Sequence, residues 1–147
     1  MWEVLPVERI RIVSDVPDWR EAVRLACEAL SLDDLPTESI AESILQNVEA
    51  NGGTGIISPY AILPQGSPIS GATERAVSAV LSRRPFYVAH ARMPIRLLVL
   101  IAAAEPHEHL DLLKQVLHVL NDRDRLDRIL SSPDARAVHR EFTGGEA

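Results

Sequence analysis

The sequence predicts an α/β fold: a single-domain α/β sandwich with a mixed central sheet covered by helices on both faces. Helical and strand-like hydrophobic patterns alternate along the chain without an internal repeat, which is typical of one α/β layer structure. Residues 97–104 are apolar at every position, as in a central strand between two helix layers. The 147 residues suffice for one hydrophobic core. We therefore expect residues 1–143 to form one domain and residues 144–147 a flexible tail.

Composition and charge narrow the classes of function. The chain is 46% hydrophobic and 24% charged, which is usual for a globular protein. Its net charge is −6 and Lys114 is its single lysine, so we expect no nucleic-acid binding, which needs a basic surface. The longest apolar run, 97–104, is short of the roughly 20 residues that a membrane helix needs, and the first residues lack a signal-peptide pattern. We expect a cytoplasmic protein that does not span a membrane.

The first third of the chain is predicted to hold a strand at residues 4–13 and two helices. Asp18 is placed to cap the first helix, with Glu21 three residues on as in a capping box. Thr37 is placed to cap the second, and Asn51-Gly52 to end it. Both helices repeat apolar residues at steps of three and four: Trp19, Ala22, Val23, Ala26, Cys27 and Leu30, then Ile40, Ala41, Ile44, Leu45 and Val48.

Four further strands are predicted in the middle of the chain, at residues 60–63, 76–81, 86–90 and 97–104. Residues 82–85 (SRRP) are expected to form a turn between two of them. Pro106 suits the first turn of the next helix, whose predicted inner stripe is Leu110, Leu113, Leu117 and Leu120. Two short helices follow: one carries Leu126, Ile129 and Leu130, and one is capped at residues 132–134 and carries Val138 and Phe142.

The glycine-rich stretch at residues 51–66 carries a resemblance to a known family. Thr54-Gly55, five residues (56–60) and then Ala61-Ile62 match, without a gap, a pattern of the type-2 IIA domains of the bacterial phosphotransferase system, the mannitol/fructose and nitrogen-regulatory branch. Members of that family carry Gly-Thr-Gly, a five-residue spacer and Ala-Ile-Pro-His-Gly. A second match is His109-Leu110, after the central apolar strand, where the family has His-Leu or His-Ile. The resemblance covers roughly residues 10–142 and implies the same α/β sandwich.

The phosphoryl-acceptor histidine that the resemblance implies is missing. Without a gap, Pro64 falls at the acceptor position; with one residue inserted, Gln65 does. An imidazole offers a neutral nitrogen as a nucleophile near pH 7, whereas an amide is a negligible nucleophile that can still donate a hydrogen bond to an anion. The second helix also carries Val48-Glu49 where many members of the family have an Arg-Glu pair. A conventional phosphoryl carrier is therefore not the function that we expect.

An anion site is expected to remain. Its predicted residues are the small polar loop Thr54, Gly55 and Ser58, the amide of Gln65, and His109 in the first turn of a helix, where free N–H groups attract anions. The alternative for His109 is a partly exposed surface histidine, and turn chemistry explains Thr54 and Ser58 equally well. No metal site and no cofactor is expected, because His107 and His109 do not share a helix face and no nucleotide-binding glycine loop is present.

Three functions remain open. The favoured one is a IIA-like regulatory or ligand-sensing domain that has lost its acceptor and is not an enzyme. The second is an active phosphocarrier with a displaced histidine, either His90 or His109. The third is an interaction domain of a larger transport protein. All three imply a protein partner (a transporter, a regulator or a phosphocarrier), and the first allows phosphate or a sugar phosphate as ligand. Arg83 and Arg84 could clamp a phosphorylated partner or simply be solvated.

Overall fold

The computed structural model describes residues 4–30, 37–50, 55–58, 60–64, 75–89, 91–103 and 105–144. A short 3-10 helix, Val7–Arg9, precedes the first strand. The strands are β1 (Ile10–Val13), β2 (Ile56–Ser58), β3 (Tyr60–Ile62), β4 (Ala76–Phe86) and β5 (Ile95–Ala102). The helices are α1 (Trp19–Leu30), α2 (Thr37–Ala50), α3 (Pro106–Leu120), α4 (Arg123–Leu130) and α5 (Ala135–Thr143).

The strands form one mixed sheet in the order β1-β4-β5-β3-β2. β4 runs parallel to β1 and antiparallel to β5, while β3 runs parallel to β5 and antiparallel to β2. The long strands β4 and β5 are therefore neighbours inside the sheet, flanked by β1 on one side and by β3 and β2 on the other. This arrangement confirms the predicted mixed sheet and the central position of the 97–104 segment.

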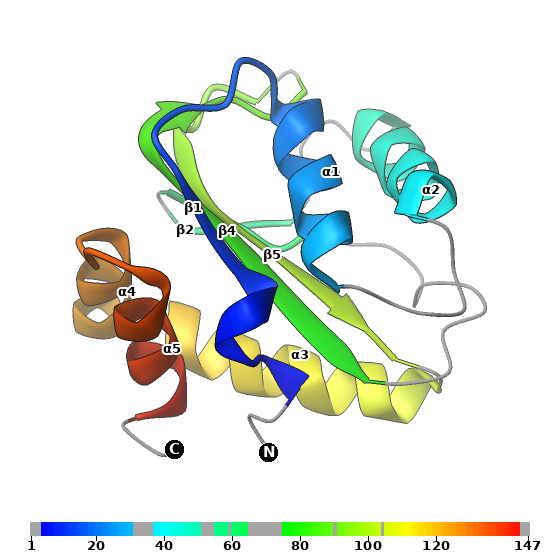
Figure 1. Cartoon of the computed structure of the whole chain (residues 1–147). Helices are drawn as coiled ribbons and strands as arrows, with labels where there is room; N and C mark the ends of the chain where they lie inside the picture. The colour runs from blue at the N-terminus through cyan, green and yellow to red at the C-terminus, as the bar shows by residue number, and fades with distance from the viewer. Residues whose placement is uncertain are drawn as a thin grey trace.

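Helices cover both faces of the sheet, as predicted. Figure 1 shows α1 and α2 on one side of the strands and α3, α4 and α5 on the other. Successive side chains of β5 point to opposite faces. Leu97, Val99 and Ile101 join the core under α3–α5, whereas Leu98, Leu100 and Ala102 join the core under α1 and α2. Leu98 is 0% exposed and Leu100 3%, so β5 is buried on both faces.

The predicted starts of α1, α3 and α5 are confirmed, whereas Thr37, the predicted cap of the second helix, is the first helical residue of α2. The N–H of Arg20 donates to Asp18 Oδ1 at 3.2 Å at the start of α1, and that of Ala137 donates to Asp134 Oδ1 at 2.9 Å at the start of α5. Pro106 is the first residue of α3, where its missing N–H costs no hydrogen bond. Asp122 caps α4 in the same way, accepting from the N–H of Arg125.

The predicted strand at residues 4–13 is wrong in its first half, because only Ile10–Val13 forms a strand. The N–H of Arg9 donates to the carbonyl of Pro6 at 2.9 Å and closes the 3-10 turn. Val4 and Leu5 are nevertheless buried, in the core under α3–α5. Their apolar side chains therefore pack into that core without belonging to a strand.

The predicted turn at residues 82–85 and the predicted strand at residues 86–90 are also wrong. β4 continues through Ser82-Arg83-Arg84-Pro85 to Phe86, and residues 87–89 form the loop after it. His90 lies outside the described residues. The pairing of β4 with β5 shifts register between Leu81 and Phe86, and the N–H of Arg84 donates to the carbonyl of Ser14 instead. This irregularity accommodates a proline that a regular ladder would exclude.

Two further details differ from expectation. The buried residues of α3 are Leu112, Val116, Val119 and Leu120, with Leu113 and Leu117 partly buried, so the predicted stripe is out of phase and Leu110 is 48% exposed. β2 was not predicted as a strand of its own, and it pairs antiparallel with β3. The predicted helix stop at Asn51-Gly52 lies outside the described residues, although α2 does end at Ala50.

Candidate functional site

Part of the predicted anion site lies at the edge of the sheet where the parallel strands β3 and β5 end. β3 and β5 are parallel, so their carboxyl ends, at Leu63-Pro64 and Ala103, meet at the same edge. Gly55 lies there too, because its carbonyl accepts a hydrogen bond from the N–H of Leu63 at 2.8 Å. Gly55 has φ of 102°, a backbone conformation that residues with a Cβ rarely adopt. The glycine that the sequence pattern singles out is thus required by the turn into β2.

The first turn of α3 begins just beyond this edge and carries His109. The N–H of His109 donates to the carbonyl of Glu105 at 3.1 Å, which places its imidazole one turn into the helix. The side chain is half-buried, and burial lowers the pKa of His109 below its ordinary value because the charged imidazolium loses hydration. His109 is therefore neutral near pH 7, with a nitrogen lone pair available as a hydrogen-bond acceptor or nucleophile.

Arg75, which was not among the predicted site residues, brings a positive charge to the same edge. It immediately precedes β4, whose first residue Ala76 pairs with Ala102 near the end of β5. Arg75 Nε lies 3.6 Å from Glu108 Oε2, one residue before His109 in α3. An arginine that directly precedes an antiparallel strand lies at the carboxyl edge of the neighbouring parallel strands. That signal could have identified it once the direction of β4 was known.

The remaining predicted site residues fall in different places. Ser58, the last residue of β2, pairs with Ala61 of β3, whereas Gly55 directly precedes the start of β2. His107 is exposed at the start of α3, and its Nδ1 lies 3.2 Å from Glu105 Oε2. Thr54, Gln65 and His90 lie outside the described residues. The structure thus places Gly55, Pro64 and the first turn of α3, which carries His109, at the same edge of the sheet as Arg75.

Neither a cluster of metal ligands nor a membrane-spanning helix is found in the described part of the chain. Within the described residues, no three histidine, cysteine, aspartate or glutamate side chains come together as metal ligands. No described helix has the length and apolar character to cross a membrane.

The candidate site offers both positive and negative charge. The start of α3 supplies free N–H groups and a positive dipole end, and Arg75 supplies a guanidinium. Glu105 and Glu108 oppose them with negative charge from the same turn.

The family model described as the phosphoenolpyruvate-dependent sugar phosphotransferase system, EIIA 2, matches residues 3–144. The chain belongs to this family. Membership confirms the resemblance drawn from the Thr54-Gly55 to Ala61-Ile62 pattern, and the matched range takes in every described helix and strand.

Relatives within the type-2 IIA family are distant in sequence and close in fold. The ascorbate-specific PTS system EIIA component of Escherichia coli is 26% identical over 122 residues, which are 82% of this chain and 79% of the relative. The solution structure of the mannitol-specific cryptic phosphotransferase enzyme IIA CmtB from Escherichia coli has a TM-score of 0.80 at 21% identity, covering 97% of both chains. The complex of enzyme IIAMTL and phosphorylated enzyme IIBMTL from Escherichia coli matches with a TM-score of 0.77 at 20% identity, covering 95% of this chain and 96% of that one.

Proposed function

We propose that this type-2 IIA domain is a regulatory or ligand-sensing module that has lost the phosphoryl-acceptor histidine. The observation that carries the proposal is in the sequence. The acceptor histidine of type-2 IIA domains directly follows the segment that corresponds to β3, whereas the first histidine of this chain is His90. Pro64 falls at that position without a gap, and Gln65 falls there with one residue inserted. Neither a proline nor an amide attacks phosphorus, so the domain passes on no phosphoryl group through this position.

The ligand of the proposed sensing site is an anion, with phosphate or a sugar phosphate as the favoured classes. The proposed site comprises Thr54, Gly55, Ser58, Gln65 and His109, to which we add Arg75. Its support is the meeting of Gly55, Arg75 and the first turn of α3 at one edge of the sheet. A guanidinium beside a helix N-terminus provides the donors that an oxyanion needs. Glu108 holds Arg75 in the absence of a ligand, and an anion would compete with it.

The proposed partner is another protein, of the transporter, regulator or phosphocarrier class, with which the domain works in the cytoplasm. Enzyme IIAMTL, whose fold this chain shares, has been solved in complex with phosphorylated enzyme IIBMTL. A IIA domain without an acceptor histidine could bind such a phosphorylated partner without receiving its phosphoryl group. In that case Arg75 and Gln65 would contact the partner's phosphoryl oxygens.

Titration of His109 by NMR, with and without inorganic phosphate, tests the anion site. A dianion near His109 stabilises the imidazolium, so the pKa of His109 should rise from its lowered value when phosphate binds. Arg75→Ala should abolish this rise, whereas Arg136→Ala, which removes an exposed arginine from α5, should leave it intact. An identical titration of His109 in both buffers, together with no effect of Gln65→Ala on phosphate affinity, would rule out the site.

A second function draws its support from the half-buried position of His109 in α3. Because burial lowers its pKa, the imidazole keeps a free nitrogen at neutral pH, as a phosphoryl acceptor must. An active phosphocarrier would then use His109, or His90, in place of the missing residue. Stoichiometric acid-labile phosphate on either histidine would establish this function. If neither an anion nor a phosphoryl group is bound, an interaction domain of a larger transport protein remains.

A further inference from the structure

The end of the sheet opposite the candidate site carries exposed aromatic and charged side chains. Tyr60 and Phe86 both pair with Ile95, so the amino ends of β3 and β5 and the carboxyl end of β4 lie side by side. The eight residues of β5 separate this end from the α3 edge by about 23 Å, at about 3.3 Å per residue. We call Tyr60, Arg84, Tyr87, Arg92 and Met93 the β4–β5 loop surface.

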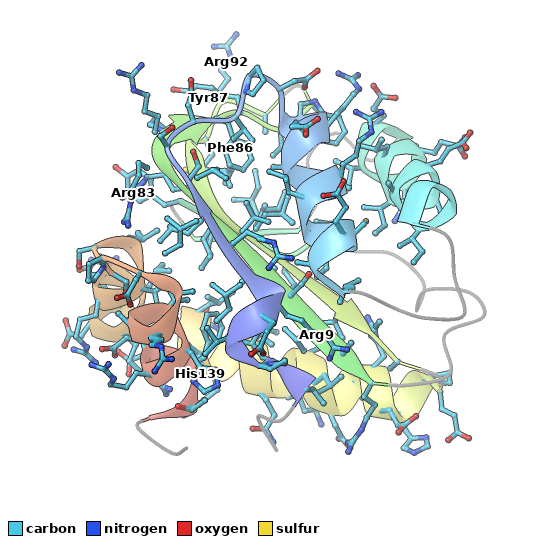
Figure 2. The ribbon with its side chains drawn as sticks, viewed as in Figure 1. Arg9, Arg83, Phe86, Tyr87, Arg92 and His139 are labelled. Atoms are coloured by element: carbon cyan, nitrogen blue, oxygen red, sulfur yellow. The ribbon has the colours of Figure 1, made fainter. Side chains whose placement is uncertain are left out.

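Large hydrophobic side chains are exposed at this surface. Tyr60 is 41% exposed, Tyr87 54% and Met93 40%; of the large hydrophobic residues in the described part of the chain that are exposed, only Leu110 lies elsewhere. Figure 2 shows Tyr87 and Arg92 at the outer end of the β4–β5 loop, while Phe86 lies below them towards the body of the protein. Tyrosine, methionine and arginine are enriched in the centres of protein interfaces.

Tyr60 is held in this exposed position at a cost in backbone strain. Its φ of 78° lies in the left-handed region, which is an outlier for an aromatic residue. The N–H of Tyr60 donates to the carbonyl of Pro94 at 3.1 Å, and the register with β5 shifts directly after it. Such irregularities re-aim side chains and gather at binding sites. Burial of the ring does not explain the strain, because the ring is exposed.

The charge of this surface is opposite to that of the whole chain. The net charge is −6, yet Arg83, Arg84 and Arg92 lie on β4 and the loop that follows it. Arg83 donates to the carbonyls of Ser132 and Pro133. Arg84 and Arg92 are exposed and form no ion pair within the described residues, although the exposed Asp15 follows Ser14, the backbone partner of Arg84. Two exposed guanidiniums at the same end of the sheet as the exposed rings attract carboxylates.

We propose that the β4–β5 loop surface docks an acidic segment of a partner protein that also carries apolar side chains. Arg84 and Arg92 bind its carboxylates, and Tyr60, Tyr87 and Met93 contact its apolar residues. The surface is separate from the α3 edge, so the domain can hold this partner whether or not the candidate anion site is occupied. The proposal therefore stands independently of the proposed function.

Peptide selection tests this docking surface. A phage library of random linear peptides is selected on the wild-type protein, and the enriched sequences are synthesised and measured by fluorescence anisotropy. We expect peptides that combine aspartate or glutamate with aromatic residues or leucine. Arg84→Glu/Arg92→Glu should weaken their binding about tenfold or more, and Tyr87→Ala by a similar factor. Added salt should weaken binding in the wild type.

The matched control is Arg123→Glu/Arg136→Glu, which makes the same charge change at exposed positions of α4 and α5. Circular dichroism checks that every variant is folded. Equal loss in both double variants, selected peptides without acidic residues, or no peptide that depends on Arg84 and Arg92 would overturn the proposal. So would a wild-type dimer in sedimentation that Arg84→Glu/Arg92→Glu dissociates, because a second copy would then occupy the surface.

Discussion

Arg96 on β5 donates a hydrogen bond from Nη2 to the backbone carbonyl of Leu130, the last residue of α4, over 2.9 Å. Its Nε donates at the same time to the carbonyl of Ser82 on β4, over 3.0 Å. One half-buried guanidinium thereby joins the two central strands to the end of a helix whose last carbonyls have no partner within the helix. The C-terminal helices are tied to the sheet through this side chain as well as through their hydrophobic face.

Replacing Arg96 with alanine should lower the free energy of unfolding by about 1–3 kcal/mol, because two backbone carbonyls lose a charged donor. Arg136→Ala, at an exposed position of α5 with no hydrogen bond within the described residues, should change it by less than about 0.5 kcal/mol. Urea unfolding followed by circular dichroism measures both. Equal stabilities of the two variants would show that the Arg96 contacts contribute nothing.

Leu100→Ala should be among the more damaging core substitutions. Leu100 is 3% exposed in the core under α1 and α2, and truncating a buried leucine costs about 2–5 kcal/mol. Leu110→Ala makes the same chemical change at a side chain that is 48% exposed, and should cost less than about 0.5 kcal/mol. Thermal and urea unfolding of the pair would contradict the placement of β5 if the two losses were the same.

The lowered pKa of His109 makes a pH-dependent contribution to stability. In the unfolded chain this imidazole titrates near 6.5, whereas in the folded protein it takes up its proton only at lower pH. As pH falls through this window the unfolded chain binds the proton first, so the His109 contribution is present above about pH 6.5 and is lost below it. The wild type should therefore lose more stability between about pH 7.5 and about pH 5.5 than His109→Gln does.

The measurement is the difference in unfolding free energy between the two pH values, compared across variants. His118→Gln, which removes an exposed imidazole from the same helix, controls for the loss of a histidine as such. If His109→Gln lost as much stability on acidification as the wild type, burial would not control this imidazole.

The sequence predicted the parts of the fold that local chemistry specifies. The run at residues 97–104 is apolar on both faces, and such a segment has few places in an α/β protein except the centre of the sheet. Asp18, Pro106 and Asp134 mark helix starts because their side chains satisfy, or do not need, the first N–H groups. These signals are local, so they could be read without the tertiary structure.

The sequence did not predict the features that pairing between distant segments decides. Residues 82–85 (SRRP) have the composition of a turn. The N–H of Arg84, however, donates to the carbonyl of Ser14, which directly follows β1, and the guanidinium of Arg83 donates to the carbonyls of residues 132 and 133. These contacts keep the segment extended. Arg75 was missed for the same reason, because its place beside α3 depends on the antiparallel direction of β4. Gly55 and His109 were predicted from the family resemblance, and not from any geometry that the sequence displays.

The absence of phosphoryl transfer is the central claim, and a labelling experiment tests it most directly. The protein is incubated with radiolabelled phosphoenolpyruvate and the general phosphotransferase enzymes, and the acid lability of any bound label is measured. The ascorbate-specific EIIA relative serves as the positive control. We predict no acid-labile label on this chain, because no imidazole stands at Pro64 or Gln65. Stoichiometric acid-labile phosphate that His109→Ala or His90→Ala removes would contradict the claim and identify an active phosphocarrier.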